Sequence, residues 1–180
     1  MKTLTITEAE KLIKKYLKER PNKIRHSILV SKFAYKIAKK IKNKHPELKI
    51  DLHEIRILGL LHDIGRGVSE RWRYHSFEGG KLLRKLGYPE YASKIEKHDP
   101  THEVAKFLKI KGDFIPKLLE EKILVYADSH YKDDKFVSPA ERSKIGLASI
   151  REKSPELLEH VRGYKKRQSR IIKEINGLMK

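Results

Sequence analysis

Apolar residues recur at helical spacing along nearly the whole chain, and no run of strand length alternates convincingly between apolar and polar residues. The clearest stripe lies between residues 22 and 44 and holds Ile24, Ile28, Phe33, Ile37 and Ile41. A period near 3.6 residues is the signal of an amphipathic helix, whereas a half-buried strand alternates every second residue. We therefore predict an all-α bundle of about seven to nine helices.

Residues that start and stop helices divide this pattern into segments. Thr7 with Glu10 fits a capping box for the first helix, and Asp51 fits an N-cap for the third. Gly87 is expected to end a short helix over residues 76–86. Proline can occupy the first helical position, so helices are also expected from Pro89 to about His98, from Pro116 to Asp128, and from Pro139 and Pro155.

The chain has 180 residues, of which 38% are apolar and 37% charged, so we expect one globular domain over residues 1–180. No stretch reaches the roughly 18 apolar residues that a membrane span needs. Glu8 and Glu10 stand where a signal peptide would be apolar, which predicts a cytoplasmic protein. A Lys- and Glu-rich chain with a single Gln is typical of thermophiles.

The absence of cysteine excludes disulfides, thiolate metal sites and cysteine nucleophiles. Any metal would be held by His, Asp or Glu, which favours Mn, Fe, Mg or Co and also allows Zn. The net charge of +18 favours phosphates, nucleotides or nucleic acid as partners. However, the basic residues are spread from Lys2 to Lys180 without a long stripe, so we expect most of them simply to solvate helix surfaces.

Several polar side chains lie on apolar stripes. His26 shares a helix face with Val30, His62 follows Leu58 by one turn, and Asp128 also follows a leucine by one turn. One inward histidine alone is usually a satisfied core residue, and one aspartate can cap a helix, but a buried carboxylate is costly unless it is paired or binds a metal. Four such groups on three helices predict a metal site made by His26, His62, Asp63 and Asp128.

These residues follow the pattern H…HD…D, with HDIG at residues 62–65. The segments RHSILVSKFAYKIA, around His26, and ILVYADSH, around Asp128, extend the pattern. The chain resembles the HD-domain superfamily of metal-dependent phosphohydrolases over residues 24–142. It is most similar to small stand-alone archaeal and bacterial HD proteins, which carry a segment like YHSFEGGKLLRKLG soon after HDIG.

The resemblance implies one or two divalent ions, of Mn, Fe, Co, Ni, Mg or Zn. In two-metal HD proteins, added histidines bind a second ion and the motif aspartate bridges both, which gives these roles to His75, His98 and Asp63. His102 competes with His98 for the later position, because the sequence after His98 differs from that of related proteins. The alternatives are an exposed loop position for His75 and a helix C-terminal position for His98.

Metal-bound water with a lowered pKa would supply hydroxide for attack on phosphorus, oriented by Asp63. Arg66 could clamp a phosphate oxygen or form an ordinary salt bridge. Arg142 lies in a segment with a Glu-Arg pair like that of related proteins, and this resemblance implies that it reaches towards the site and binds substrate. In RWRYH, Arg71 and Arg73 flank Trp72, which suits base stacking next to phosphates, although a core tryptophan is the alternative.

We therefore expect an enzyme that hydrolyses a phosphate ester of a small metabolite, most simply a nucleotide, as a phosphomonoesterase, cyclic phosphodiesterase or dinucleoside polyphosphate hydrolase. The alternatives are a metal-dependent single-strand nuclease, a nucleic-acid binding protein and a non-catalytic HD scaffold. The intact H…HD…D set argues against the scaffold. No membrane partner is expected. Residues 154–180 predict a closing helix or a dimer face, so a monomer or a homodimer is expected. No role is assigned to His45, His53, His130 or His160.

Overall fold

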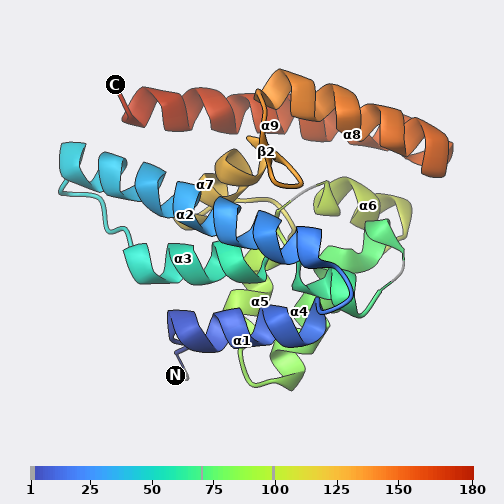
Figure 1. Ribbon diagram of the computed structural model, residues 1–180. Coiled ribbons are helices and arrows are strands. Elements are labelled where there is room, and N and C mark those ends of the chain that lie inside the picture. The colour runs from blue at the N-terminus through green and yellow to red at the C-terminus, as the bar shows by residue number, and fades with distance from the viewer. Residues whose placement is uncertain (1–2, 70, 99) are drawn as a thin grey trace.

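The structure, a computed structural model, describes residues 3–69, 71–98 and 100–180, and only the backbone of Trp72. Over these ranges the prediction of an all-α fold is confirmed, and nine α-helices are present (Figure 1). Their bounds are α1 Ile6–Tyr16, α2 Pro21–Lys44, α3 Leu52–Leu61, α4 His75–Lys85, α5 Pro89–Ile95, α6 Thr101–Phe107, α7 Leu119–Asp128, α8 Pro139–Lys153 and α9 Leu158–Leu178. Short 3₁₀ turns are η1 Ile64–Gly67, η2 Trp72–Tyr74 and η3 Pro155–Leu157.

The first helix has a different cap from the predicted one. Thr5, and not Thr7, is the N-cap of α1: its hydroxyl accepts from the Glu8 backbone N–H, and the Glu8 carboxylate accepts from the Thr5 N–H. The prediction was wrong because both threonines precede a glutamate by three residues, and only the tertiary packing decides between them. Asp51 caps α3 as predicted, accepting from the backbone N–H groups of His53 and Glu54.

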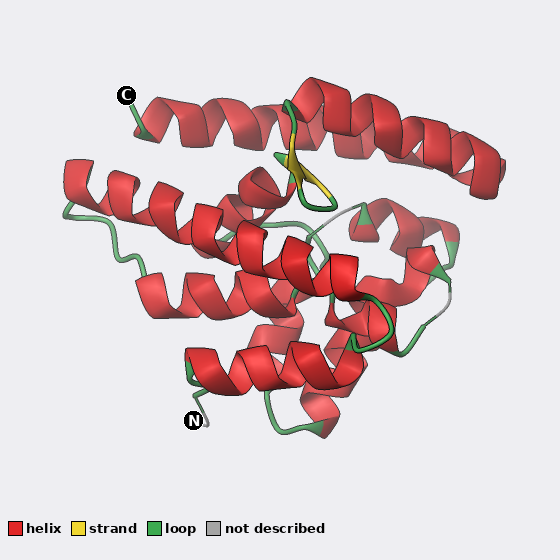
Figure 2. Ribbon diagram, in the orientation of Figure 1, coloured by secondary structure: helices red, strands yellow, loops and turns green. Residues whose placement is uncertain are grey.

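Other boundaries also differ from the expectations. The segment expected as one helix over residues 89–98 ends at Ile95, and α6 follows as a separate helix. α7 begins at Leu119 rather than Pro116. A short antiparallel hairpin, unexpected from the sequence, pairs β1 Tyr131–Lys132 with β2 Lys135–Phe136 (Figure 2).

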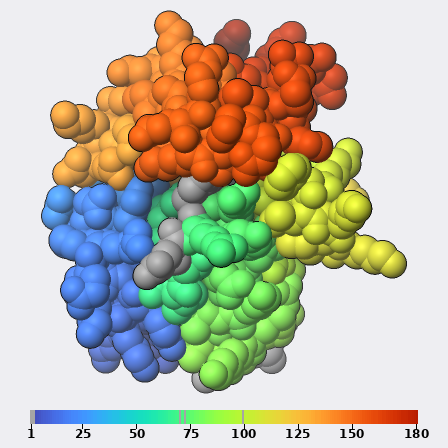
Figure 3. Space-filling view, turned by 90° about the vertical axis from the view of Figure 1, so that its right-hand side faces the viewer, coloured from blue at the N-terminus to red at the C-terminus, as the bar shows by residue number. Residues whose placement is uncertain are grey.

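The helices pack in layers around the ends of α3 and α7. α2 lies against α3 so closely that a Cβ on Gly59 would come within 2.5 Å of the Ser31 Cα. α8 and α9 cover one side of the bundle, seen as the orange layer over the N-terminal half in Figure 3. None of the described helices combines the length and the apolar character that a membrane crossing requires.

Two apolar cores hold these layers together. The larger core is built from α1, α2, α3, α4, α5, α7 and α9 and includes Ile13, Leu58 and Ile123. The smaller core joins α4, α6 and α8 to the start of α9 through Phe77 and Val161. The prediction of one domain over residues 1–180 stays a prediction.

Candidate metal centre

Six buried side chains, which five helices carry or closely precede, meet in the interior of the bundle. Their exposed fractions are at most 8%, so each has been taken out of water. Four of the six lie at or within two residues of a helix terminus, one lies in the segment between α5 and α6, and only His26 comes from within a helix. They are His26 on α2, His62 and Asp63 after α3, His75 at the first position of α4, His98 after α5, and Asp128 at the last position of α7.

The first group consists of His26, His62 and Asp128. The His26 Nε2 lies 3.0 Å from the Asp128 Oδ1 and 3.2 Å from the His62 Nε2. The His62 Nε2 lies 3.5 Å from the same oxygen. The Asp63 Oδ2 lies 3.9 Å from both ring nitrogens. Three ligand atoms therefore face one small volume, with a fourth beside it.

Backbone carbonyls fix the protonation of both rings. The His26 Nδ1–H donates to the Asp133 carbonyl at 2.8 Å, and the His62 Nδ1–H donates to the Gly59 carbonyl at 2.9 Å. A carbonyl can only accept, so each Nδ1 must hold a proton, and the Nε2 of a neutral ring is bare. Two bare nitrogens 3.2 Å apart repel each other unless a proton or a metal ion lies between them. Outer carbonyls that orient histidines in this way are usual around metal ions.

The second group consists of Asp63, His75 and His98. The His75 Nε2 lies 3.2 Å from the His98 Nε2 and 3.3 Å from the Asp63 Oδ1, which is 3.9 Å from the His98 Nε2. The His98 Nδ1–H donates to the Ile95 carbonyl, so its Nε2 also faces the group without a proton in the neutral ring. The two oxygens of Asp63 therefore face different groups, Oδ2 the first and Oδ1 the second.

A close helix contact brings His75 to Asp63. A Cβ on Gly65 would lie 1.9 Å from the His75 carbonyl oxygen and 2.5 Å from the Gly79 nitrogen. Only glycine allows the turn after Asp63 to pass so close to α4. The glycine of the HDIG motif is therefore required in this chain for the close packing of the turn against α4. The helix expected over residues 76–86 begins one residue earlier, at His75, and Tyr74 is its N-cap.

Arg66 adds a positive charge to the second group. Its Nε lies 2.7 Å from the Asp63 Oδ1, and its Nη2 lies 3.3 Å from the His75 Nε2. In the first group, the partners of the Asp128 carboxylate within 4 Å are histidines alone in the described part of the chain. The guanidinium therefore faces the second group and leaves the first without a permanent cation.

The site lowers the pKa of both aspartates. Burial by itself raises the pKa of Asp63, but the charge of Arg66, together with His62 and His98, brings it well below its ordinary value. Burial also raises the pKa of Asp128, and its contacts with His26 and His62 lower it well below the usual range. Both carboxylates are thus stabilised as anions, Asp63 by Arg66 and the histidines around it, and Asp128 by the two histidines that face it.

The hairpin supports His26 from outside, which the sequence did not reveal. Asp133, at φ 53°, presents its carbonyl to the His26 ring, while its side chain pairs with Lys23 at 2.8 Å and Lys132 at 2.7 Å. Partial burial raises the pKa of Asp133, but these two lysines lower it below its ordinary value. The sequence signal for this hairpin was the turn Lys-Asp-Asp-Lys between two aromatic residues. That turn does not indicate by itself that a carbonyl within it would contact His26.

The remaining predicted residues lie around these groups. His98, and not the half-buried His102, is brought to His75. Arg73 pairs with Glu156 at 2.8 Å, and Arg142 donates from Nε to the Tyr131 carbonyl at 2.9 Å. Arg71 is exposed, and its guanidinium lies 6.0 Å from the Tyr74 ring. The expected stacking by Trp72 falls on a side chain outside the described residues.

The four histidines without an assigned role have ordinary contacts. His53 contacts the Leu4 carbonyl through Nε2, and the His130 Nδ1 contacts the Tyr126 carbonyl. The remaining two are His45, which pairs with Glu47, and His160, whose ring packs on Phe107. None of these four is among the groups described above.

Comparison with known proteins agrees with this geometry. A family model described as "HD domain" matches residues 24–132. An uncharacterized protein of Methanocaldococcus jannaschii is 40% identical over 113 residues, which are 60% of this chain and 65% of that protein. No solved structure matches. The chain belongs to the HD domain family, and so to a superfamily of metal-dependent phosphohydrolases whose members bind divalent metals.

Proposed function

We propose that this protein is a metal-dependent phosphohydrolase acting on a small phosphorylated metabolite, most simply a nucleotide. The observation that carries the proposal is the facing pair of ring nitrogens in the first group. The Nδ1–H groups of His26 and His62 donate to backbone carbonyls, and their Nε2 atoms lie 3.2 Å apart. The anionic carboxylate of Asp128 lies beside these two Nε2 atoms. A divalent cation fits this donor set, because neutral imidazole nitrogens and carboxylate oxygens are ligands for such ions.

In this proposal the first ion is held by His26, His62, Asp63 and Asp128, and the second by Asp63, His75 and His98. The donor set of nitrogen and oxygen without sulfur suits Mn, Fe, Co, Ni, Mg or Zn. When bound, the ions would supply a nucleophile from water near neutral pH and positive charge opposite the phosphoryl oxygens.

The residues of the chain would orient the reactants. Asp63 stays deprotonated at neutral pH, since its pKa is lowered, so it accepts hydrogen bonds and does not donate them. Arg66 is half-buried beside it and would bind a phosphate oxygen through its guanidinium. Arg71, Arg73 and Arg142 would bind the rest of the substrate, and Arg73 would have to exchange its contact with Glu156 for this role.

The test is a phosphate-release screen with the metal-free protein reloaded separately with each of the six metals. The substrates are nucleoside monophosphates, cyclic nucleotides, dinucleoside polyphosphates and single-stranded oligonucleotides. We expect turnover of a mononucleotide or dinucleotide that is lost in Asp128→Asn. The matched control is Asp113→Asn, an aspartate whose ion pair with Lys117 lies on the surface.

Two results would contradict the proposal. Equal turnover by wild type and Asp128→Asn would mean that a contaminant acts. Shortening of oligonucleotides without turnover of small substrates would replace the proposal by the nuclease alternative.

A further inference from the structure

The outward face of α2 carries only basic side chains. Every exposed residue between positions 23 and 42 of this helix is Arg or Lys, and the helix contains no acidic residue in its 24 positions. The exposed faces of α1, α8 and α9 mix both signs of charge. The basic residues are dispersed along the sequence, yet the fold turns several of them outward along α2. The exposed basic residues are Arg25, Lys32, Lys36, Lys39, Lys40 and Lys42.

Helical geometry places most of these residues in a row, here called the α2 stripe and defined as Arg25, Lys32, Lys36, Lys39 and Lys40. At about 100° per residue all five lie within a sector of roughly 100°. At about 1.5 Å per residue the row is about 22 Å long. The stripe is therefore a row of cations along one side of α2, with successive members seven, four, three and one residues apart.

The four lysines of the stripe have no acidic partner among the described residues, unlike some lysines elsewhere in the molecule. Within residues 3–69, 71–98 and 100–180, no carboxylate lies within 4 Å of Lys32, Lys36, Lys39 or Lys40. By contrast, Lys94 pairs with Glu54 and Lys97 pairs with Glu121, each at close range. Like charges four residues apart destabilise a helix. The stripe thus has a local cost that an anionic partner would offset.

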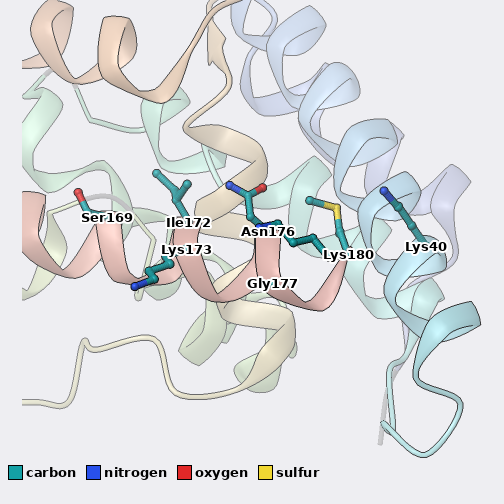
Figure 4. Close-up of a pocket in the computed structure, with 8 residues that line it drawn as sticks. Lys40, Ser169, Ile172, Lys173, Asn176, Gly177 and Lys180 are labelled. Carbon is teal, nitrogen blue, oxygen red and sulfur yellow. The ribbon is translucent and has the colours of Figure 1, made fainter.

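The stripe continues into a groove between α2 and the end of α9. The groove has a volume of about 700 Å³, and its walls carry basic, polar and apolar side chains, among them Lys40, Lys173, Lys180, Ser169, Asn176, Ile172 and Met179. Figure 4 shows Lys40 reaching from α2 beside the last turns of α9. The line of positive charge therefore extends beyond one helix.

We propose that the α2 stripe and this groove bind nucleic acid through its phosphate backbone. A polymer with one negative charge at each regular interval complements this row of cations, whose four lysines have no carboxylate within 4 Å among the described residues and whose Arg25 has only an exposed pair with Asp134. An anionic membrane fits less well, because an interfacial helix needs apolar anchors. The exposed large apolar side chains of the described residues are Val68, Ile110, Leu118 and Phe136, none of them on α2 or α9.

The test measures binding of fluorescently labelled 20-nucleotide single strands and duplexes to the full-length protein by anisotropy over a series of salt concentrations. The variant carries Lys32→Gln, Lys36→Gln, Lys39→Gln and Lys40→Gln together. The matched control carries Lys11→Gln, Lys14→Gln, Lys15→Gln and Lys18→Gln, which remove the same charge from exposed positions at and after α1. Circular dichroism checks that both variants fold.

We expect the α2 variant to bind at least about ten-fold more weakly at physiological salt and the control to stay near wild type. For a single strand, each phosphate contact contributes about 0.7 to the magnitude of the slope of log K against log salt. Removing four lysine contacts should therefore reduce the magnitude of that slope by about 3. Metal-free protein and Asp128→Asn should bind as wild type does, which separates this proposal from the phosphohydrolase proposal.

Other outcomes would overturn the assignment. Equal weakening in both variants would mean that total charge, and not the stripe, determines binding. Unchanged nucleic-acid binding in the α2 variant, with loss of binding to phosphatidylserine vesicles, would assign the surface to a membrane. Self-association that the α2 variant abolishes, without any nucleic-acid binding by wild type, would assign it to a second copy of the chain.

Discussion

The two groups of the candidate metal centre differ in how their charge is balanced. The first, His26, His62 and Asp128, has no permanent cation among its described partners within 4 Å. The second faces the guanidinium of Arg66, which lies 2.7 Å from the shared Asp63. An anion buried without a cation is costly, whereas an ion pair already offsets part of that cost. The first group therefore has more to gain from a metal ion than the second.

The groups also differ in the elements that hold them. α2, α3 and α7, which position the first group, all contribute to the larger apolar core. The second group depends on the first residue of α4 and on His98, which lies three residues beyond the seven-residue α5, although both helices also contribute to the larger core. We infer that the first ion binds more tightly, and that the second binds where Arg66 must move aside.

Removing a ligand of the first group should have the largest effect. His62→Ala and Asp128→Ala should each lose both ions and lower turnover by more than about a hundred-fold, because changes outside the ligands already cost up to that much. Elemental analysis and phosphate release measure this. Metal content equal to that of wild type in both variants would disprove the ligand assignment.

Removing a ligand of the second group should have a smaller effect on metal content. His98→Ala should retain about one ion and lose most of the activity, while His102→Ala should behave as wild type, because His102 lies on α6 outside the group. If His102→Ala loses an ion and His98→Ala does not, the ligand of the second ion is His102 and the assignment to His98 is wrong.

Arg66 allows a direct test of the charge difference. Arg66→Ala should bind the second ion more tightly, because a competing cation is removed, yet turn over substrate roughly ten- to a thousand-fold more slowly, on the scale of losing one charge-stabilising donor. Titration of metal-free protein with Mn²⁺ measures the affinity. Arg66→Lys, which keeps the charge, is the control. Weaker binding of the second ion in Arg66→Ala would show that Arg66 supports that ion instead of competing with it.

The smallest expected effect concerns the support of His26. Asp133→Asn keeps a residue that tolerates positive φ but removes the ion pairs with Lys23 and Lys132, so affinity for the first ion should fall by roughly ten-fold. The neighbouring Asp134→Asn, whose pair with Arg25 is exposed, should leave it unchanged.

The Asp133 effect should depend on pH in one direction only. Because the folded pKa of Asp133 is lowered, its stabilising pairs are present above the unfolded value of about 3.9 and are lost as the pH falls through the folded pKa. The difference between Asp133→Asn and wild type should therefore be constant across the neutral range. A difference that grows between about pH 6 and 8 would implicate another group.

The two groups of the candidate metal centre also differ in how well the sequence predicts them. His26, His62 and Asp128 stand out because their neighbours one turn away are apolar, and helical spacing alone places them inward. His75 and His98 lie at helix ends without such a stripe, so only the resemblance to a family identified them. The carbonyl of Asp133 and the direction of Arg66 depend on contacts between distant segments, which no local pattern contains. The thermophile composition and the nucleotide substrate stay predictions.

The shared carboxylate has a thermodynamic consequence. Asp63 directs one oxygen towards each group, so an ion that fixes the carboxylate from one side also orients the oxygen offered to the other. Binding at the two positions is then linked: if the first ion raises the affinity for the second, the second raises the affinity for the first by the same factor. Two ions held in this way would load cooperatively, and a chelator would remove them over a narrower concentration range than two independent sites would allow.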